Sequence, residues 1–135
     1  MTSRHGVTAM LASGLLLSAC GSGHAARLST NSATPTQVAM SWFDTINSND
    51  VRAAYRLFEP SQIDQIAWMK QPASDQSKFT DIHCRVTVMT KKRATVLCTF
   101  AESASPTEGQ PSTSWSVSFQ RSTTNGWLIN NYGQG

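Results

Sequence analysis

The sequence predicts an α+β fold in which N-terminal helices pack on a curved antiparallel sheet of about four strands. Apolar residues recur at helical spacing between residues 35 and 71, and they occupy alternate positions from Phe79 onward. Because the helical patterns all precede the strand patterns, the chain favours helices gathered on one face of an antiparallel meander. The 135 residues are enough for one domain.

The first helix is predicted to begin at Pro35. Thr34 can serve as its N-cap, proline fits the first helical position, and Gln37 stands where a capping box needs it. One apolar face follows, made of Val38, Ala39, Trp42, Phe43 and Ile46. The polar run over residues 47–50 ends this helix.

Two shorter helices are expected next. Asp50 can cap the second, which Glu59-Pro60 stops. Its apolar stripe is Val51, Ala54, Tyr55 and Phe58. A third helix begins at Ser61 and ends at Gln71-Pro72. The side chains that we expect it to pack are Ile63, Ile66 and Ala67.

Four strands follow. The apolar positions of the first two are Ile82, Cys84, Val86 and Val88, and then Ala94, Val96, Cys98 and Phe100. A turn around Thr90-Lys91-Lys92 joins them, which predicts a hairpin with one apolar face. After a long polar turn over residues 102–113, Trp115, Val117 and Phe119 mark the third strand. Asn125-Gly126 is a tight-turn signal before a fourth strand over Trp127–Tyr132.

Residues 1–19 are typical of a secretory signal. A positive start at Arg4 precedes an apolar stretch from Val7 to Leu17, and small residues follow. The run LSAC that ends at Cys20 resembles the lipobox of bacterial lipoproteins. That resemblance implies cleavage before Cys20, acylation of Cys20 with chains such as palmitate, and anchoring to the cell membrane, or to the outer membrane if the cell has one. An ordinary cleaved signal with an unrelated cysteine is the alternative.

The predicted organisation is therefore a lipoprotein signal peptide over residues 1–19, a flexible tether over 20–34 and a folded domain over 35–135. The tether is expected because residues 21–34 are small and polar and cannot bury enough surface to order themselves.

Cys84 and Cys98 are predicted to form a disulfide. Both lie on the apolar face of adjacent strands, and a turn centred on Lys91 places them opposite each other, within reach of a bridge. Outside the membrane such a pair can oxidise. Two buried free thiols are the alternative. No metal site is predicted, because only His83 is near and it points to the other face.

The folded part resembles the cystatin-like cone fold of nuclear transport factor 2, ketosteroid isomerase and the polyketide cyclases. The resemblance runs from about Pro35 to Gly133 and is carried by the opening VAMSWFDTINSNDVRAAYRLF and the closing SWSVSFQRSTTNGWLINNYG. It implies a cone-like domain. Enzymes of this superfamily place an Asp, His or Tyr inside the cone, where burial raises a carboxylate's pKa.

The expected inner face of the first three strands offers no group that is ionisable at neutral pH once the cysteines are bridged, which counts against an enzymatic site. Asp44 and Tyr55, from the helices, are the candidate acid/base pair. Candidate pocket-lining residues, with core packing as the alternative role, are Trp42, Phe43, Tyr55, Phe100, Trp115 and Phe119.

The other sheet face carries Asp81, His83 and Arg85 in one row, and Leu97 on the neighbouring strand. His83, Arg85 and Leu97 are candidate interface residues for a homodimer or a complex. A solvated sheet face with modest ion pairing is the alternative.

The net charge of +3 comes without a Lys/Arg block, so we expect no nucleic-acid partner. No apolar run is long enough for an integral membrane span. The leading hypothesis is a lipid-anchored, non-enzymatic cell-envelope module that needs no cofactor and binds an envelope protein or a small apolar ligand. The alternative is an isomerase or dehydratase that acts on a small hydrophobic substrate.

Overall fold

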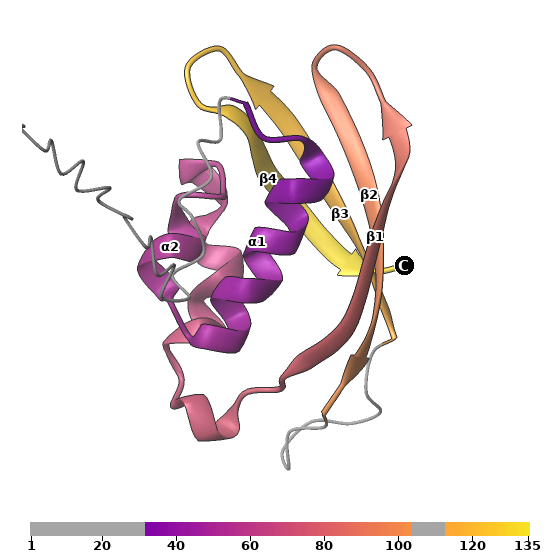
Figure 1. The fold of residues 1–135 in the computed structure, drawn as a ribbon. Helices are drawn as coiled ribbons and strands as arrows, with labels where there is room; N and C mark the ends of the chain where they lie inside the picture. Colours follow the sequence, from indigo (N-terminus) through magenta and orange to yellow (C-terminus); the bar gives the residue numbers. More distant parts are fainter. Residues whose placement is uncertain (1–31, 104–112) are drawn as a thin grey trace, which may run out of the picture.

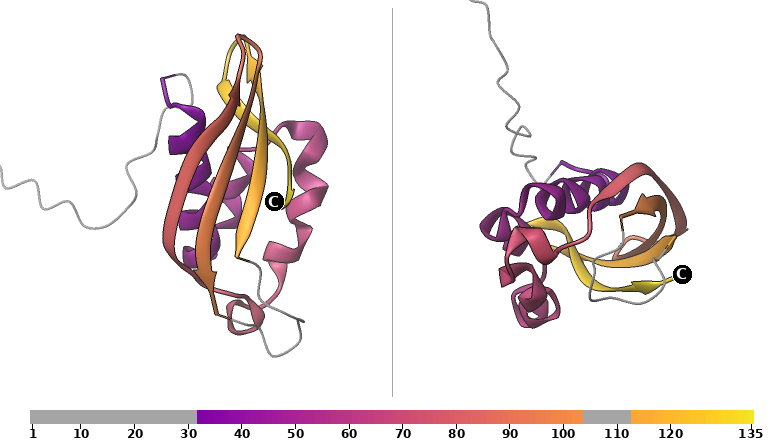
Figure 2. Two further views of the ribbon diagram at one scale, coloured as in Figure 1. Left: turned by 90° about the vertical axis from the view of Figure 1, so that its right-hand side faces the viewer. Right: turned by 90° about the horizontal axis from the view of Figure 1, so that it is seen from below.

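A four-stranded antiparallel sheet forms one layer of the molecule, and the helices lie against one of its faces (Figure 1). The computed structural model describes residues 32–103 and 113–135. Its helical elements are α1 (Pro35–Ser48), α2 (Val51–Tyr55) and the 3-10 helices η1 (Pro60–Lys70) and η2 (Ala73–Asp75). Its strands are β1 (Phe79–Met89), β2 (Arg93–Glu102), β3 (Ser114–Ser122) and β4 (Gly126–Gln134), adjacent in that order. The predicted α+β class and the meander are confirmed, and Figure 2 shows the twist of the sheet.

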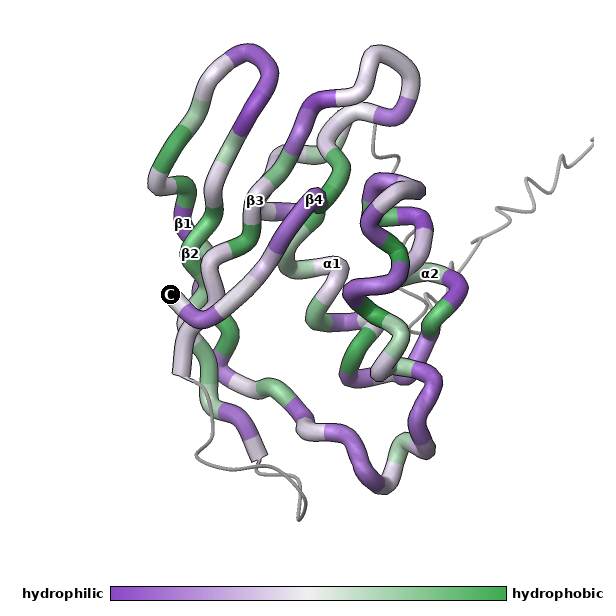
Figure 3. Tube along the Cα trace, turned by 180° about the vertical axis from the view of Figure 1, so that it is seen from behind, coloured by the Kyte–Doolittle hydropathy of each residue, from purple (hydrophilic) through white to green (hydrophobic). Residues whose placement is uncertain are grey.

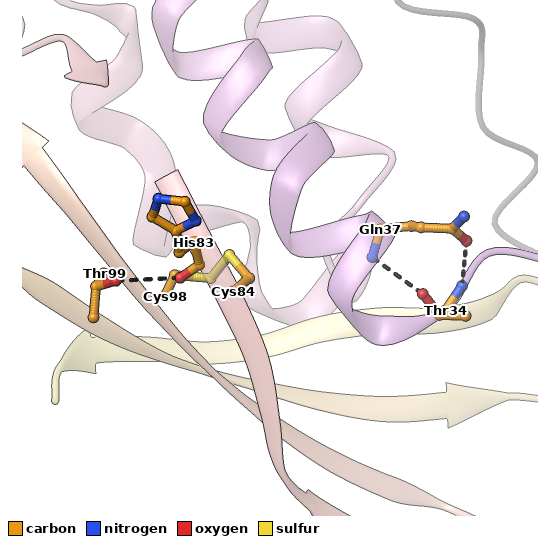
Figure 4. Close-up of a disulfide and its surroundings, with 6 residues drawn as sticks. All are labelled: Thr34, Gln37, His83, Cys84, Cys98 and Thr99. Atoms are coloured by element: carbon orange, nitrogen blue, oxygen red, sulfur yellow. Dashed lines mark hydrogen bonds between the residues drawn. A yellow bond between two sulfur atoms is a disulfide. The ribbon is translucent and has the colours of Figure 1, made fainter. Parts of the chain in front are cut away.

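Helix α1 begins with the predicted capping box. The Thr34 hydroxyl accepts a hydrogen bond from the Gln37 N–H (3.2 Å), and the Gln37 side-chain oxygen accepts one from the Thr34 N–H (2.9 Å; Figure 4). At the other end Asn49 has a left-handed backbone with φ of 54°, which asparagine adopts more readily than most residues. The predicted apolar face of α1 is buried against the sheet.

The second helix is shorter than predicted. α2 ends at Tyr55, and Phe58 forms an isolated parallel bridge with Ile129 of β4 instead of continuing the helix. The Glu59 N–H donates to the Ile129 carbonyl (2.9 Å), and the Ile129 N–H donates to the Leu57 carbonyl (2.8 Å). Pairing with the edge of the sheet thus overrides the helical spacing of the apolar residues.

The third predicted helix is the 3-10 helix η1. Ile66 interrupts it with a non-helical backbone (φ −108°, ψ 18°), in keeping with the rarity of long 3-10 runs. Ile66 and Met69 are buried and Ile63 is half-buried, whereas Ala67 is exposed and does not pack as expected.

An irregularity near the start of β1 displaces the alternation of its side chains. Between Thr80 and His83, β1 contains one residue more than the facing segment of β2, and Asp81 in this segment has a φ of 50°. Phe79 is buried although simple alternation would place it on the same side as His83. Asp81 therefore does not continue the regular row of His83 and Arg85.

A second irregularity, at Thr87, changes the sheet face to which the following side chains of β1 point. The pairs around it are Val86 with Val96, Val88 with Thr95 and Met89 with Ala94. On β2, Ala94 and Val96 are buried, and Thr95 between them faces the other way. The extra residue thus directs Val88 to the helix-free face and Met89 to the helix face. The expectation that Val88 shares the inner face is wrong for this reason.

The side chain of Asn47 fixes the end of α1 to the beginning of β1, an edge strand of the sheet. Its Oδ1 accepts a hydrogen bond from the Phe79 N–H (2.8 Å), and its Nδ2 donates to the Phe79 carbonyl (2.7 Å). The amide therefore binds the backbone of Phe79 as a neighbouring strand would.

Candidate functional site

Cys84 and Cys98 lie at disulfide distance, as the sequence predicts (Figure 4). They are direct partners in the pairing of β1 with β2, with 2.03 Å between the sulfurs and 4.0 Å between the Cα atoms. Cys98 belongs to the buried core and Cys84 packs against it. The bridge joins the edge strand to its neighbour beneath α1.

Aromatic rings fill the space between α1 and the sheet. Trp42 and Phe43 are fully buried, and their ring centroids lie 5.3 and 5.5 Å from that of Trp115. Phe100 lies 5.3 Å from Phe43, and Phe119 is buried in the same cluster. Five of the six candidate pocket-lining residues therefore pack on one another or in the shared core, and Tyr55 lies half-buried on α2.

The structure does not bring Asp44 and Tyr55 into an enclosed site. Asp44 is exposed on α1. Tyr55 packs at the edge of the core, and the Lys70 ammonium lies 6.0 Å from its ring centroid. Asp44 therefore lies at the surface and not in an enclosed site.

Tyr132 forms a polar cluster that the sequence does not predict. Its hydroxyl accepts a hydrogen bond from the Trp68 indole N–H (2.7 Å) and donates to the Gln65 carbonyl (2.8 Å), which joins β4 to η1. Burial raises the pKa of the Tyr132 phenol above its ordinary 10.0, and the hydrogen bond from Trp68 opposes that rise. The phenol is therefore uncharged at neutral pH, and its one proton is donated in the hydrogen bond to the Gln65 carbonyl.

The candidate interface residues do share the helix-free face. His83 is opposite Thr99, and Arg85 is opposite Leu97 in the same ladder. His83 and Arg85 are exposed and Leu97 is half-buried. The structure therefore brings these three together on one surface.

A groove of about 680 Å³ lies beside the start of α1. It is lined by residues 32–36, by Val86, Met89, Thr90 and Lys91 of the first hairpin, and by Arg121, Gly126 and Trp127 of the second. The two hairpins meet there, because the Arg121 N–H donates to the Lys92 carbonyl (2.8 Å). Figures 1 and 2 show both hairpins extending beyond the first turn of α1.

The groove combines apolar walls with positive charge. Val86 and Met89 are exposed although they lie on the helix face of the sheet. The Arg121 guanidinium lies 5.5 Å from the Trp127 ring centroid, a cation–π contact. Lys91 is the second cation, and among the described residues the lining contains no carboxylate.

Sequence reasoning missed this groove because it assigned Val86 and Val88 to the interior. The turn Thr90-Lys91-Lys92 next to a valine-rich strand is the signal that could have found it. Figure 3 shows the hydrophilic turn of the first hairpin beside hydrophobic strand segments.

Within the described residues no group of three or more His, Cys, Asp or Glu could hold a metal ion. In the same two ranges no helix is long and apolar enough to cross a membrane. The predicted lipid site Cys20 lies outside the described residues. No protein-family model and no curated protein matches this chain.

Proposed function

We propose that this chain is an exported protein anchored by a lipid on Cys20, whose folded part is a non-enzymatic binding module of the cell envelope. The apolar stretch before LSAC and the small polar segment after it support the anchor. We further propose the cone-like fold of the nuclear transport factor 2 and ketosteroid isomerase superfamily. Helices that precede a twisted meander and cover one of its faces support it.

The filled interior is the observation that carries the non-enzymatic function. A substrate between α1 and the sheet would have to displace Trp42, Phe43 and Trp115, which are in ring contact. Truncating rings of this kind in a core costs about 3–5 kcal/mol, so such a displacement is expensive. The ligand or partner therefore binds at the surface.

The groove is the binding surface that this proposal requires. Its exposed apolar walls and its cations Lys91 and Arg121 suit a partner or ligand with an apolar part and a negative group. We expect Val86→Ser with Met89→Ser to lose a ligand that native mass spectrometry finds on the full chain. Leu97→Ser, on the helix-free face, is the matched control. Equal retention by both variants would exclude the groove.

The lipid anchor is tested in a bacterial host that processes lipoproteins. We expect membrane fractionation and an added acyl mass on the wild-type chain, and the loss of both in Cys20→Ala. Ser22→Ala, two residues away, should keep both. A wild-type chain without acyl mass would contradict the anchor.

The enzyme alternative makes a different prediction for Asp44. An isomerase or dehydratase that uses this carboxylate would lose turnover in Asp44→Asn. The exposed position of Asp44 predicts unchanged stability and unchanged ligand retention in that variant.

A further inference from the structure

The end of the β1–β2 hairpin exposes apolar side chains on both of its faces. Val86 and Met89 are 39% and 53% exposed on the helix face, and Val88 is 51% exposed on the other. The irregularity at Thr87 produces this arrangement, since it reverses the alternation between Val86 and Val88.

Positive charge is concentrated at the same end. The segments that build it, residues 32–36, 86–94 and 119–128, contain four cations and no carboxylate. These four cations surround the ends of the hairpins: Lys91, Lys92, Arg93 and Arg121. The opposite end, where α1 finishes and β1 begins, carries Asp50, Asp75, Asp81 and Glu102 together with Lys78, whose ammonium donates to the Asn47 carbonyl. Among the described residues the hairpin end is therefore the more positive of the two.

The chain enters the fold at this positive end. Ser32 and Ala33 line the groove, and Cys20 stands twelve residues before Ser32 in the sequence. Even a fully extended chain of that length spans at most about 43 Å. A lipid on Cys20 therefore keeps Ser32, at the groove end of the fold, within about 43 Å of the membrane surface.

We propose that this end is a docking face for the anionic phospholipid surface to which the chain is anchored. Val86, Val88 and Met89 enter the headgroup region, while Lys91, Lys92 and Arg121 bind lipid phosphates. The guanidinium of Arg121, 5.5 Å from the Trp127 ring centroid, can offer phosphate a pair of donors. This inference rests on the proposed lipid anchor and names the chemistry that the groove recognises.

Charge favours the lipid surface over a second copy of the chain as the occupant. A symmetric contact through this face would bring Lys91, Lys92, Arg93 and Arg121 of each copy together, and like charges repel. An anionic surface offers the complementary sign along the whole face.

The test uses the lipidated full chain, with its anchor confirmed by mass, in vesicles of phosphatidylcholine with or without phosphatidylglycerol. An environment-sensitive dye is attached at Thr123→Cys, in the β3–β4 turn beside the groove, or at the exposed Ala73→Cys of η2, at the opposite end. We expect a blue-shifted, brighter signal at position 123 on phosphatidylglycerol vesicles only, and an unchanged signal at position 73. Salt should reverse the change.

Charge variants give a quantitative check. Each cation at an anionic surface favours binding about fivefold, so Lys91→Gln, Lys92→Gln and Arg121→Gln together should lower the ratio of docked to undocked domain about 100-fold. The control removes three exposed cations elsewhere, with Arg52→Gln, Arg56→Gln and Lys70→Gln, and should keep docking.

The outcomes separate the two proposals. Two results with an acylated chain would overturn the docking face and leave the lipid anchor intact. One is a dye signal at position 123 that is the same with and without phosphatidylglycerol. The other is docking that both sets of variants weaken equally. A phosphatidylglycerol response that light scattering traces to dimers also overturns the docking face. A chain without acyl mass refutes the anchor first.

Discussion

Reduction of the Cys84–Cys98 bridge should lower stability mainly through the unfolded chain. The two residues are 14 apart in sequence, and a closed loop of about 15 residues is worth about 3 kcal/mol in the entropic estimate. Cys98 is fully buried, so its thiol stays packed after reduction and few native contacts are lost. For a domain of about 100 residues, 3 kcal/mol corresponds to about 12–24 °C in Tm.

Urea unfolding of the Cys20→Ser chain, followed by tryptophan fluorescence with and without reductant, measures this loss. We expect a lower midpoint on reduction and a steeper denaturant dependence, because the uncross-linked unfolded chain exposes more surface. Cys84→Ala with Cys98→Ala is the control and should not respond to reductant. A loss below about 1 kcal/mol would refute the loop-closure argument.

Three further predictions concern the cap, the polar cluster and the helix-free face. Thr34→Ala should cost about 1 kcal/mol in urea unfolding, and Thr36→Ala less; equal costs would argue against the capping box. The raised pKa of Tyr132 means that its contribution to stability is complete below pH 10 and is lost as the pH rises through the folded-state pKa. Tyr132→Phe should remove this loss of unfolding free energy at high pH. An unfolding free energy that depends on pH in the same way in the variant and the wild type would contradict this prediction. If the helix-free face forms a homodimer, Leu97→Glu halves the mass in light scattering, and an unchanged mass excludes that interface.

The helix-to-strand order, the capping box and the cysteine pairing could be predicted because each depends on local chemistry or on a simple period. Thr34 and Gln37 stand at capping positions, and a hairpin turn centred on Lys91 places Cys84 opposite Cys98. These features need no knowledge of distant contacts.

The groove and the Tyr132 cluster could not be predicted, because extra residues in strands change which side chains share a face. Asp81 and Thr87 do this in β1, and the pairing of β3 with β4 skips Asn130, which turns Tyr132 toward η1. None of the three is a glycine, so nothing in the local sequence marks them. The early end of α2 has a similar cause, since Phe58 pairs with a strand about seventy residues later.

The irregular backbone pairing of β1, an edge strand of the sheet, also affects aggregation. An unpaired edge strand can recruit the same strand of another molecule, and the longer and straighter the edge is, the greater that hazard becomes. In β1 the Asn47 amide already binds the backbone of Phe79, and the irregularities near Asp81 and at Thr87 leave only residues 83–86 as a regular run. Exposed Arg85 lies within that run and adds charge. Molecules crowded on one surface would therefore find too short a straight edge in β1 to join into a continuous intermolecular sheet through that strand.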